Sequence, residues 1–258
     1  RCVSSLNITS DSFTEVYQPV SEIGQVRVSN LSSSEVTITF VTDQPSLATI
    51  QYGTSSQTDQ QLEETGTASH LHSLRLSGLS AETDYYFKVV AGGLTEDNQG
   101  SCYHFTTCNT DNGTPYSVYG RVLMEDTTTP ATGVLVHLEL SSSNGDQSLP
   151  LSSLTNSDGY WNLDLGNLRQ AGSLEVLDYQ LNDLMRVEAE AGPAGWGQQE
   201  AAVATDPQEI STITLQQIIS LEINLVKGLN LVTLPVDPIS NLAASGLLSA
   251  IDSSQEVF

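Results

Sequence analysis

The sequence predicts an all-β protein, built from tandem β-sandwich (immunoglobulin-like) modules and a short C-terminal β-plus-helix segment. Three observations support this prediction. Apolar and polar residues alternate with period two through residues 73–91, on both sides of a tight corner. Similar short runs recur along the chain with turn residues between them, as in sandwiches and barrels. Residues 109–115 are rich in turn formers and separate two such series.

The corner within residues 73–91 indicates how its two strands are joined. Leu74 and Leu76 alternate with polar residues before it, and Tyr85, Phe87 and Val89 alternate with other residues after it. A buried tyrosine needs a hydrogen-bond partner for its hydroxyl group, and the backbone of a corner offers one. We therefore expect Tyr85 to fasten the corner.

The remaining strands of the first module are expected at residues 25–29, 36–41, 48–53 and 102–107. Residues 43–46 are expected to turn, and residues 54–69 form a polar connection. The spacing Leu79-x-x-x-Thr83-x-Tyr85 resembles the E–F corner of fibronectin type III domains. The runs TITFVTDQPSLATIQYG and HSLRLSGL resemble the variant of that fold found in front of purple acid phosphatases. The metal-binding motifs of the phosphatase catalytic domain are absent from the sequence, so this resemblance implies a fold and no activity.

The second module is expected to have strands at residues 116–125, 133–140, 160–165, 184–191, 201–204 and 210–215. Its runs PATGVLVHLEL and LTNSDGYWNLDL resemble carboxypeptidase regulatory-like domains, which are also called transthyretin-like or Cna-B-like. Cna-B-like domains often contain a Lys–Asn isopeptide bond. No lysine lies between Lys88 and Lys227, which excludes that bond within this module.

The expected organisation is an N-terminal arm (1–24), a first module (25–108), a linker (109–115), a second module (116–216) and a C-terminal segment (217–258). The run GLNLVTLPVDP resembles the opening of a further β-rich module of bacterial surface proteins. About forty residues cannot bury a core alone. We expect the C-terminal segment to start a further module or to pair with a neighbouring subunit.

Composition and charge exclude some classes of function. The chain has 258 residues and a net charge of −23, which disfavours nucleic-acid and anionic-membrane binding. No stretch is long and apolar enough to span a bilayer. The chain begins with Arg1 rather than Met, and cysteines are few. These features favour an extracellular or cell-surface protein whose signal peptide has been removed.

The three cysteines allow a pairing prediction. Cys102 and Cys108 would lie about 20 Å apart along one extended strand, whereas a disulfide tolerates Cα separations of only about 7 Å. In a fibronectin-like sandwich the last strand starts at the pole where the chain enters, so the resemblance implies a disulfide between Cys2 and Cys102. Cys108 would then be free or would pair between molecules. The alternative is that all three thiols stay reduced.

Candidate sites for chemistry are sparse. His70 and His72 have a spacing that metal ligands use, but no third ligand follows at a recognisable spacing. Turn formation is the favoured interpretation of four acidic turns that could also hold a calcium ion; they contain Asp97, Asp111, Asp146 and Asp158. No catalytic or haem-attachment motif is found. The sequence thus predicts a protein that is not an enzyme and has no cofactor.

Two functions fit these features. The preferred one is a structural or adhesive protein that assembles with itself into a fibre or layer by strand addition between subunits. Its candidate donor segments are residues 3–8, 15–20 and 218–226. The alternative is the accessory region of a larger secreted hydrolase, which would bind glycans or another ligand. Trp196, in a glycine-rich run, is its stacking candidate, followed by Tyr86 and Tyr179, whereas Trp161 is expected in the core.

Overall fold

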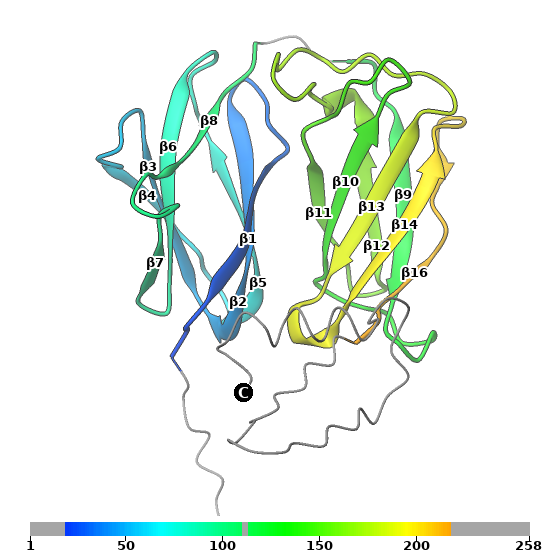
Figure 1. Cartoon of the computed structure of the whole chain (residues 1–258). Helices are drawn as coiled ribbons and strands as arrows, with labels where there is room; N and C mark the ends of the chain where they lie inside the picture. Colours follow the sequence, from blue (N-terminus) through cyan, green and yellow to red (C-terminus); the bar gives the residue numbers. More distant parts are fainter. Residues whose placement is uncertain (1–18, 110–112, 218–258) are drawn as a thin grey trace, which may run out of the picture. The chain divides into compact units, whose positions relative to one another are not determined.

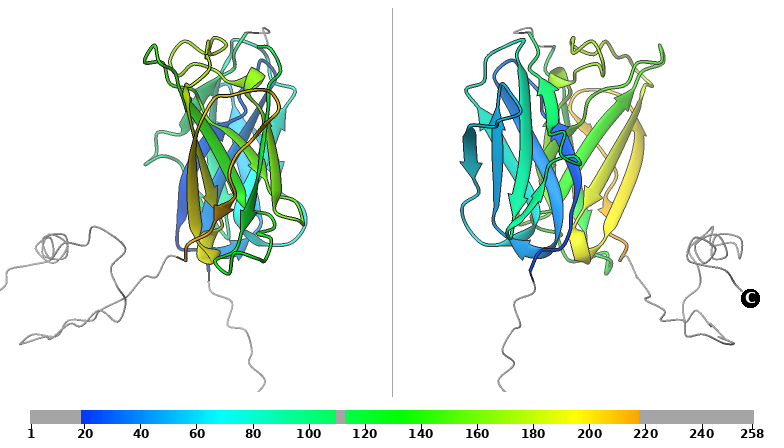
Figure 2. Two further views of the ribbon diagram at one scale, coloured as in Figure 1. Left: turned by 90° about the vertical axis from the view of Figure 1, so that its right-hand side faces the viewer. Right: turned by 60° about the vertical axis from the view of Figure 1, so that its left-hand side comes forward.

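The structure is a computed structural model that describes residues 19–109 and 113–217. These residues belong to one compact unit and form strands joined by loops and two single 3₁₀ turns. They enclose two hydrophobic cores, one within residues 20–105 and one within residues 118–215. Each core lies between two sheets, as Figures 1 and 2 show. The predicted fold class, two β-sandwiches in tandem, is confirmed, and the predicted C-terminal β-plus-helix segment lies outside the described residues.

The first sandwich pairs one sheet in the order β1-β2-β5 with a second in the order β4-β3-β6-β7, in which β8 also pairs with β6 (Figure 1). Its strands are β1 (Ile23–Ser29), β2 (Glu35–Ser46), β3 (Ala48–Gly53), β4 (Gln60–Glu63), β5 (Ser69–Ser77), β6 (Asp84–Ala91), β7 (Leu94–Glu96) and β8 (Tyr103–Thr106).

The corner between β5 and β6 follows the alternation in the sequence. Leu74 and Leu76 of β5 are buried, as are Tyr85, Phe87 and Val89 of β6. The backbone N–H of Ser80 donates a hydrogen bond to the Tyr85 hydroxyl at 3.0 Å. This bond connects the loop to the strand that follows it, so the buried phenol keeps a partner and the corner is held closed.

We expect Tyr85→Phe to lower the free energy of unfolding by about 0.5–1.5 kcal/mol, because the Ser80 N–H loses its partner while the ring stays packed. Urea unfolding followed by circular dichroism measures this loss. Tyr86→Phe is the matched control, because the Tyr86 ring lies on the other face of β6. An equal loss in both variants would contradict the role of the Tyr85 hydroxyl.

Three strands of the first sandwich, β2, β4 and β7, differ from the sequence-based expectation, which placed no strand at β7. β2 continues through residues 43–46, so the predicted turn there is wrong. The pairing of β2 with β5 shifts register between Val41 and Ser46, and this irregularity lets the strand bend without ending. β4 lies inside the expected polar connection. Only Leu62 of this edge strand packs on the core. Its sequence therefore lacks the apolar alternation from which a strand is predicted.

The second sandwich pairs a sheet in the order β11-β10-β13-β14 with one in the order β12-β9-β15, in which β16 also pairs with β9 (Figure 1). Its elements are β9 (Ser117–Leu123), β10 (Leu135–Ser141), β11 (Leu151–Leu154), β12 (Tyr160–Asp164), the 3₁₀ turn η1 (Leu165–Asn167), β13 (Leu184–Glu190), the 3₁₀ turn η2 (Gly192–Ala194), β14 (Trp196–Ala202), β15 (Gln208–Glu209) and β16 (Ile213–Thr214). β14 begins earlier than expected, because residues 198–200 are polar and its pairing with β13 defines it.

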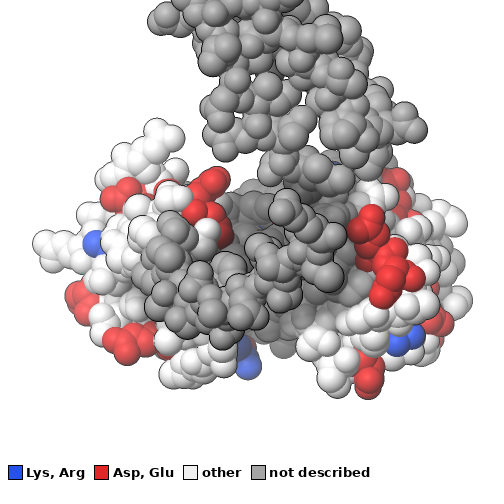
Figure 3. Space-filling model, turned by 90° about the horizontal axis from the view of Figure 1, so that it is seen from below, with Lys and Arg blue, Asp and Glu red and all other residues white. Residues whose placement is uncertain are grey.

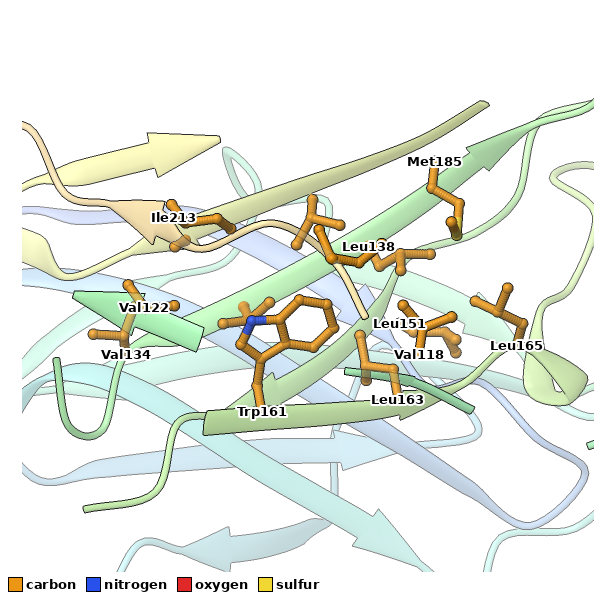
Figure 4. Packing of buried hydrophobic residues seen from close by; sticks show 14 of the residues in the cluster. Val118, Val122, Val134, Leu138, Leu151, Trp161, Leu163, Leu165, Met185 and Ile213 are labelled. Carbon is orange, nitrogen blue, oxygen red and sulfur yellow. The ribbon is translucent and has the colours of Figure 1, made fainter. Parts of the chain in front are cut away.

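Trp161 occupies the middle of the second core. Figure 4 shows its indole ring near the side chains of Val122 on β9 of the same sheet, Val134 just before β10, and Leu138 on β10 of the facing sheet. The ring fits because Gly120 lies opposite it on β9, where an added Cβ would come within 2.8 Å of the ring. The expectation that Trp161 packs in the core is therefore confirmed.

The surface of the described residues carries dispersed negative charge. Figure 3 shows acidic side chains at several separate places on one face, with few Lys or Arg side chains among them. This dispersal matches a solvated acidic surface more closely than a single acidic site.

Candidate functional site: the polar contact between the two sandwiches

The outer face of β2 is buried, although its side chains are polar. The threonines at 37 and 39 alternate with core residues, and the sequence predicts them to face water. Thr39 is instead fully buried, because β10 of the second sandwich lies against it. The Thr39 hydroxyl and Nε2 of His137 on β10 are 2.9 Å apart. Beside this pair, the hydroxyl groups of Ser29 and Ser152 are 2.7 Å apart. The outer faces of the two sandwiches therefore contact each other through hydrogen-bonded polar side chains.

Asn30 adds a second set of bonds to this contact. Its side-chain amide donates to the backbone carbonyl of Ser152 at 2.9 Å, and its side-chain oxygen accepts from the Ser152 N–H at 2.9 Å. The Asn30 backbone N–H donates to the Pro150 carbonyl at 3.1 Å. This reciprocal pattern imitates strand pairing between the sandwiches, and it leaves few buried backbone groups without partners.

Charged side chains of the two sandwiches also contact each other. Arg27 on β1 forms an ion pair with Glu188 on β13, with 2.9 Å between Nη1 and Oε2. Glu188 also contacts Arg186 at 2.8 Å. The Gln25 side-chain amide donates to a Glu190 carboxylate oxygen at 3.2 Å. Arg27 and Glu188 are each partly shielded from water, which strengthens their attraction relative to a surface pair.

His137 stays uncharged in this setting. Burial lowers the pKa of its imidazole to about 4, with a further lowering from the positive charge of Arg27, while Glu188 opposes the change. A neutral imidazole suits a contact with a hydroxyl group, because one ring nitrogen can accept or donate a hydrogen bond without a buried charge.

The ion pair of Arg27 and Glu188 should couple the sandwiches measurably. In a double-mutant cycle with Arg27→Met and Glu188→Gln, we expect a coupling energy of about 0.5–1 kcal/mol, because the pair is only partly exposed. A parallel cycle with Arg186→Met gives the control, since the Arg186 side chain is 52% exposed. Urea unfolding of the four variants in each cycle provides the numbers. A coupling energy for Arg186 as large as that for Arg27 would contradict this assignment.

The residues of this contact were not singled out by the sequence. Thr39, Ser29 and His137 occupy outward positions on strands and Asn30 directly follows β1, and polar residues at such places normally face solvent. A single sequence does not distinguish a solvated polar face from a polar face that another module covers. In β2 and β10, polar side chains are buried as well as apolar ones. The polar side chains are buried because the other sandwich covers them.

The two histidines considered as metal ligands have other roles. Nδ1 of His72 lies 2.7 Å from a Glu64 carboxylate oxygen, and Nε2 of His72 lies 3.1 Å from the Thr42 hydroxyl. The His72 ring stacks on Phe40, with 4.5 Å between ring centroids. His70 contacts the Thr42 carbonyl instead. Hydroxyl, imidazole and carboxylate follow the order found in hydrolases, but Thr42 and His72 are buried, so no substrate can reach them.

Two of the calcium candidates, Asp97 and Asp146, accept hydrogen bonds through their carboxylates. The Asp97 carboxylate accepts from the Gly100 N–H at 2.7 Å, and the Asp146 carboxylate accepts from the Gln170 side chain at 2.6 Å. Asp158 lies in the exposed hairpin before β12, where its N–H donates to the Asn156 side chain. Asp111 lies outside the described residues. Within residues 19–109 and 113–217, no group of three or more His, Cys, Asp or Glu side chains could hold a metal ion. The expectation that these turns hold no metal cofactor stays a prediction.

The cysteines are partly described. Cys108 is buried as a free thiol, and burial raises its pKa, so it is protected from pairing between molecules. Cys102 is a half-exposed free thiol whose sulfur lies 3.8 Å from the Ser56 carbonyl. We expected Cys102 to lie at the pole of the sandwich where the chain enters. β8 instead begins opposite Phe87, in the middle of β6, so Cys102 lies away from that pole. Cys2 lies outside the described residues, and its disulfide with Cys102 stays a prediction.

The aromatic candidates for ligand stacking are less available than expected. Trp196 does not lie in a loop; it begins β14, pairs with Gln216 through both backbone groups and is half-buried. Tyr86 is half-buried beside His104. Tyr179 packs edge-on against Tyr116, with 6.2 Å between ring centroids. The two tyrosines line an open cavity of about 490 Å³ together with Gly113, Thr114, Pro115, Gly166, Val176, Leu177 and Asp178.

These observations define a class of protein: a two-sandwich β-protein whose modules meet through a buried polar contact. The family model described as "Purple acid Phosphatase, N-terminal domain" matches residues 23–107. This match confirms the resemblance of the first sandwich, and the resemblance of the second stays a prediction. No curated protein sequence matches the chain. No helix among the described residues is long and apolar enough to cross a membrane.

Solved structures superpose only loosely on the chain. The shaft pilin SpaA from Lactobacillus rhamnosus GG is 12% identical and covers 71% of this chain and 91% of its own, at a TM-score of 0.28. The pilus 2b backbone protein of group B streptococcus is 8% identical and covers 75% and 97%, at 0.25. The central fibronectin-III array of RIM-binding protein is 14% identical and covers 71% and 63%, at 0.26. At TM-scores this low, the fold assignment rests on the strand pairings themselves.

Proposed function

We propose that this chain is a non-catalytic extracellular protein with a structural or adhesive role, which assembles with copies of itself into a surface fibre or layer. The observation that carries the proposal is the buried polar contact between the sandwiches, centred on Thr39 and His137. Tandem modules joined only by a linker bend freely, whereas modules joined by a hydrogen-bonded contact transmit force as one body.

Assembly would proceed by strand addition. β5 is the last strand of the sheet β1-β2-β5, and it is nine residues long. A long edge strand presents a row of backbone groups that an extended segment from another subunit can pair with. The candidate donors, residues 3–8 and 218–226 and most of 15–20, lie outside the described residues. Apolar and polar residues alternate through residues 219–225, which supports the role of donor for the C-terminal candidate.

Electron microscopy of the purified full chain tests this function. We expect fibres or sheets that lengthen with protein concentration. Leu6→Pro and Ile223→Pro each place a proline in one candidate donor, where it removes an N–H group that strand pairing requires. One of these variants should abolish assembly while circular dichroism stays unchanged. Only monomers of the unmodified chain at all concentrations would contradict the proposal.

An exported location fits the same function. A net charge of −23 keeps a surface protein soluble and repels nucleic acid. Fractionation of the source cells, with antibody detection of the chain in the external fraction, tests the location.

A second candidate is glycan binding as the accessory region of a larger secreted hydrolase. Tyr160 on β12 is 45% exposed, and Asn162 on the same face of that strand is exposed as well. The Arg121 guanidinium lies over the Tyr160 ring, 5.1 Å from its centroid, so a sugar would stack on the other face of the ring and bond to the Asn162 side chain. Binding to a glycan array that is lost in Tyr160→Ala and kept in Tyr86→Ala would favour this function over the fibre.

A further inference from the structure

We propose that His137 is an acid-sensitive clasp: when its imidazole takes up a proton, the polar contact between the two sandwiches opens. The clasp would let a mildly acidic environment loosen the two-sandwich body while each sandwich keeps its own fold. The inference concerns the described contact alone and does not depend on the proposed assembly.

The geometry places His137 where a positive charge is poorly tolerated. Its ring is buried on the outer face of β10 and contacts Thr39 from the other sandwich. The ionisable groups around it come from β1, from β13 and from its own strand; they are Arg27, Glu139, Arg186 and Glu188. Arg27 and Arg186 both contact Glu188, so this carboxylate already serves two cations. A protonated imidazole would add a third cation to this group.

Opening the contact would relieve that conflict. In the parted state His137 is exposed to water, and an exposed histidine has a pKa of about 6.5. In the closed state burial and Arg27 lower the pKa of the imidazole to about 4. As the pH falls from neutral to about 5, the parted state therefore binds a proton and the closed state does not. Protonation shifts the equilibrium toward the parted state throughout this range.

The expected size of the shift follows from the two pKa values. Between pH 7.5 and pH 5.0 the equilibrium constant for closing should fall about 30-fold. The lower limit of pH 5.0 lies above the usual pKa of carboxylates, which is about 4. Among the ionisable groups that line the cavity at His137, only its imidazole has an ordinary pKa inside this window. His70 lies beside Gly192 of the second sandwich, and the His137→Gln variant keeps His70 and so controls for it.

Hydrogen exchange on the full chain measures the clasp directly. The backbone N–H groups of Asn30 and Ser152 donate across the contact, to the Pro150 carbonyl and the Asn30 side chain. After correction for intrinsic exchange rates, their protection should fall about 30-fold from pH 7.5 to pH 5.0. The N–H groups of β6, which lies inside the first sandwich, should keep their protection.

His137→Gln is the control variant, because an amide can still bond with Thr39 but does not titrate. We expect its protection at Asn30 and Ser152 to be independent of pH, with β6 protection reporting that the variant is folded. A fall in this variant equal to that in the unmodified chain would overturn the proposal. So would constant protection in the unmodified chain. An NMR titration gives an independent check, since a His137 pKa of about 6 or above in the closed protein would also overturn it.

Discussion

Replacing Trp161 with alanine should lower the free energy of unfolding of the second sandwich by about 3–5 kcal/mol. The indole is almost fully buried, and Gly120 and Val134 among others surround it, so its removal would leave a large cavity in a closed core. Its ring nitrogen has no hydrogen-bond partner among the residues that the structure describes, which indicates that packing accounts for its contribution. Urea unfolding followed by circular dichroism measures the loss.

Trp196→Ala is the matched control for Trp161→Ala. Trp196 is half-buried at the start of β14, and its pairing with Gln216 uses backbone groups that the substitution keeps. We expect a much smaller loss of stability. A loss of less than about 1 kcal/mol in Trp161→Ala would contradict the central position of the indole in the core.

His72→Ala should destabilise the first sandwich by about 2–4 kcal/mol. The substitution removes the ring that stacks on Phe40, and it leaves the Glu64 carboxylate and the Thr42 hydroxyl without their contacts to the imidazole. Glu64 follows β4 of one sheet, whereas His72 and Thr42 belong to the other sheet. The network therefore ties the two sheets together at one edge of the sandwich, and its loss affects both.

His70→Ala separates this structural role from metal binding. His70 is half-buried, and its ring hydrogen-bonds with the Thr42 carbonyl, so we expect a loss of less than about 1 kcal/mol. If the two histidines instead held a metal ion, both variants would lose the same stabilisation by added Zn²⁺. Thermal unfolding with and without Zn²⁺ distinguishes the two cases, and we expect no shift for the unmodified chain.

The class of fold was predictable because sandwich strands carry their own signal. Each of β5, β6 and β9 alternates in burial with period two, and that alternation is present in the residues themselves. β4 and β14 were missed or begun too late because they are polar along much of their length. Such strands form because a neighbouring strand offers backbone partners, and that information lies elsewhere in the chain.

The candidate site was predictable to a much smaller extent. The corner at Tyr85 depends on residues close together in sequence, so a local spacing could indicate it. The contact between Thr39 and His137 joins residues 98 positions apart. No local pattern records which outer face of one sandwich meets which outer face of another, and the residues involved have no unusual spacing.

The sequence by itself determined which side chains face each core, because period-two alternation leaves only one face of a strand apolar. It also determined the acidic character of the surface and the corner that Tyr85 closes. Only the tertiary structure decided that Ser29, Thr39 and His137 are buried. Polar side chains can form hydrogen bonds equally well with water or with one another. The residue types alone therefore do not reveal whether a polar face is exposed or buried. That choice depends on the second sandwich covering the first, and on it depends whether His137 can carry a charge.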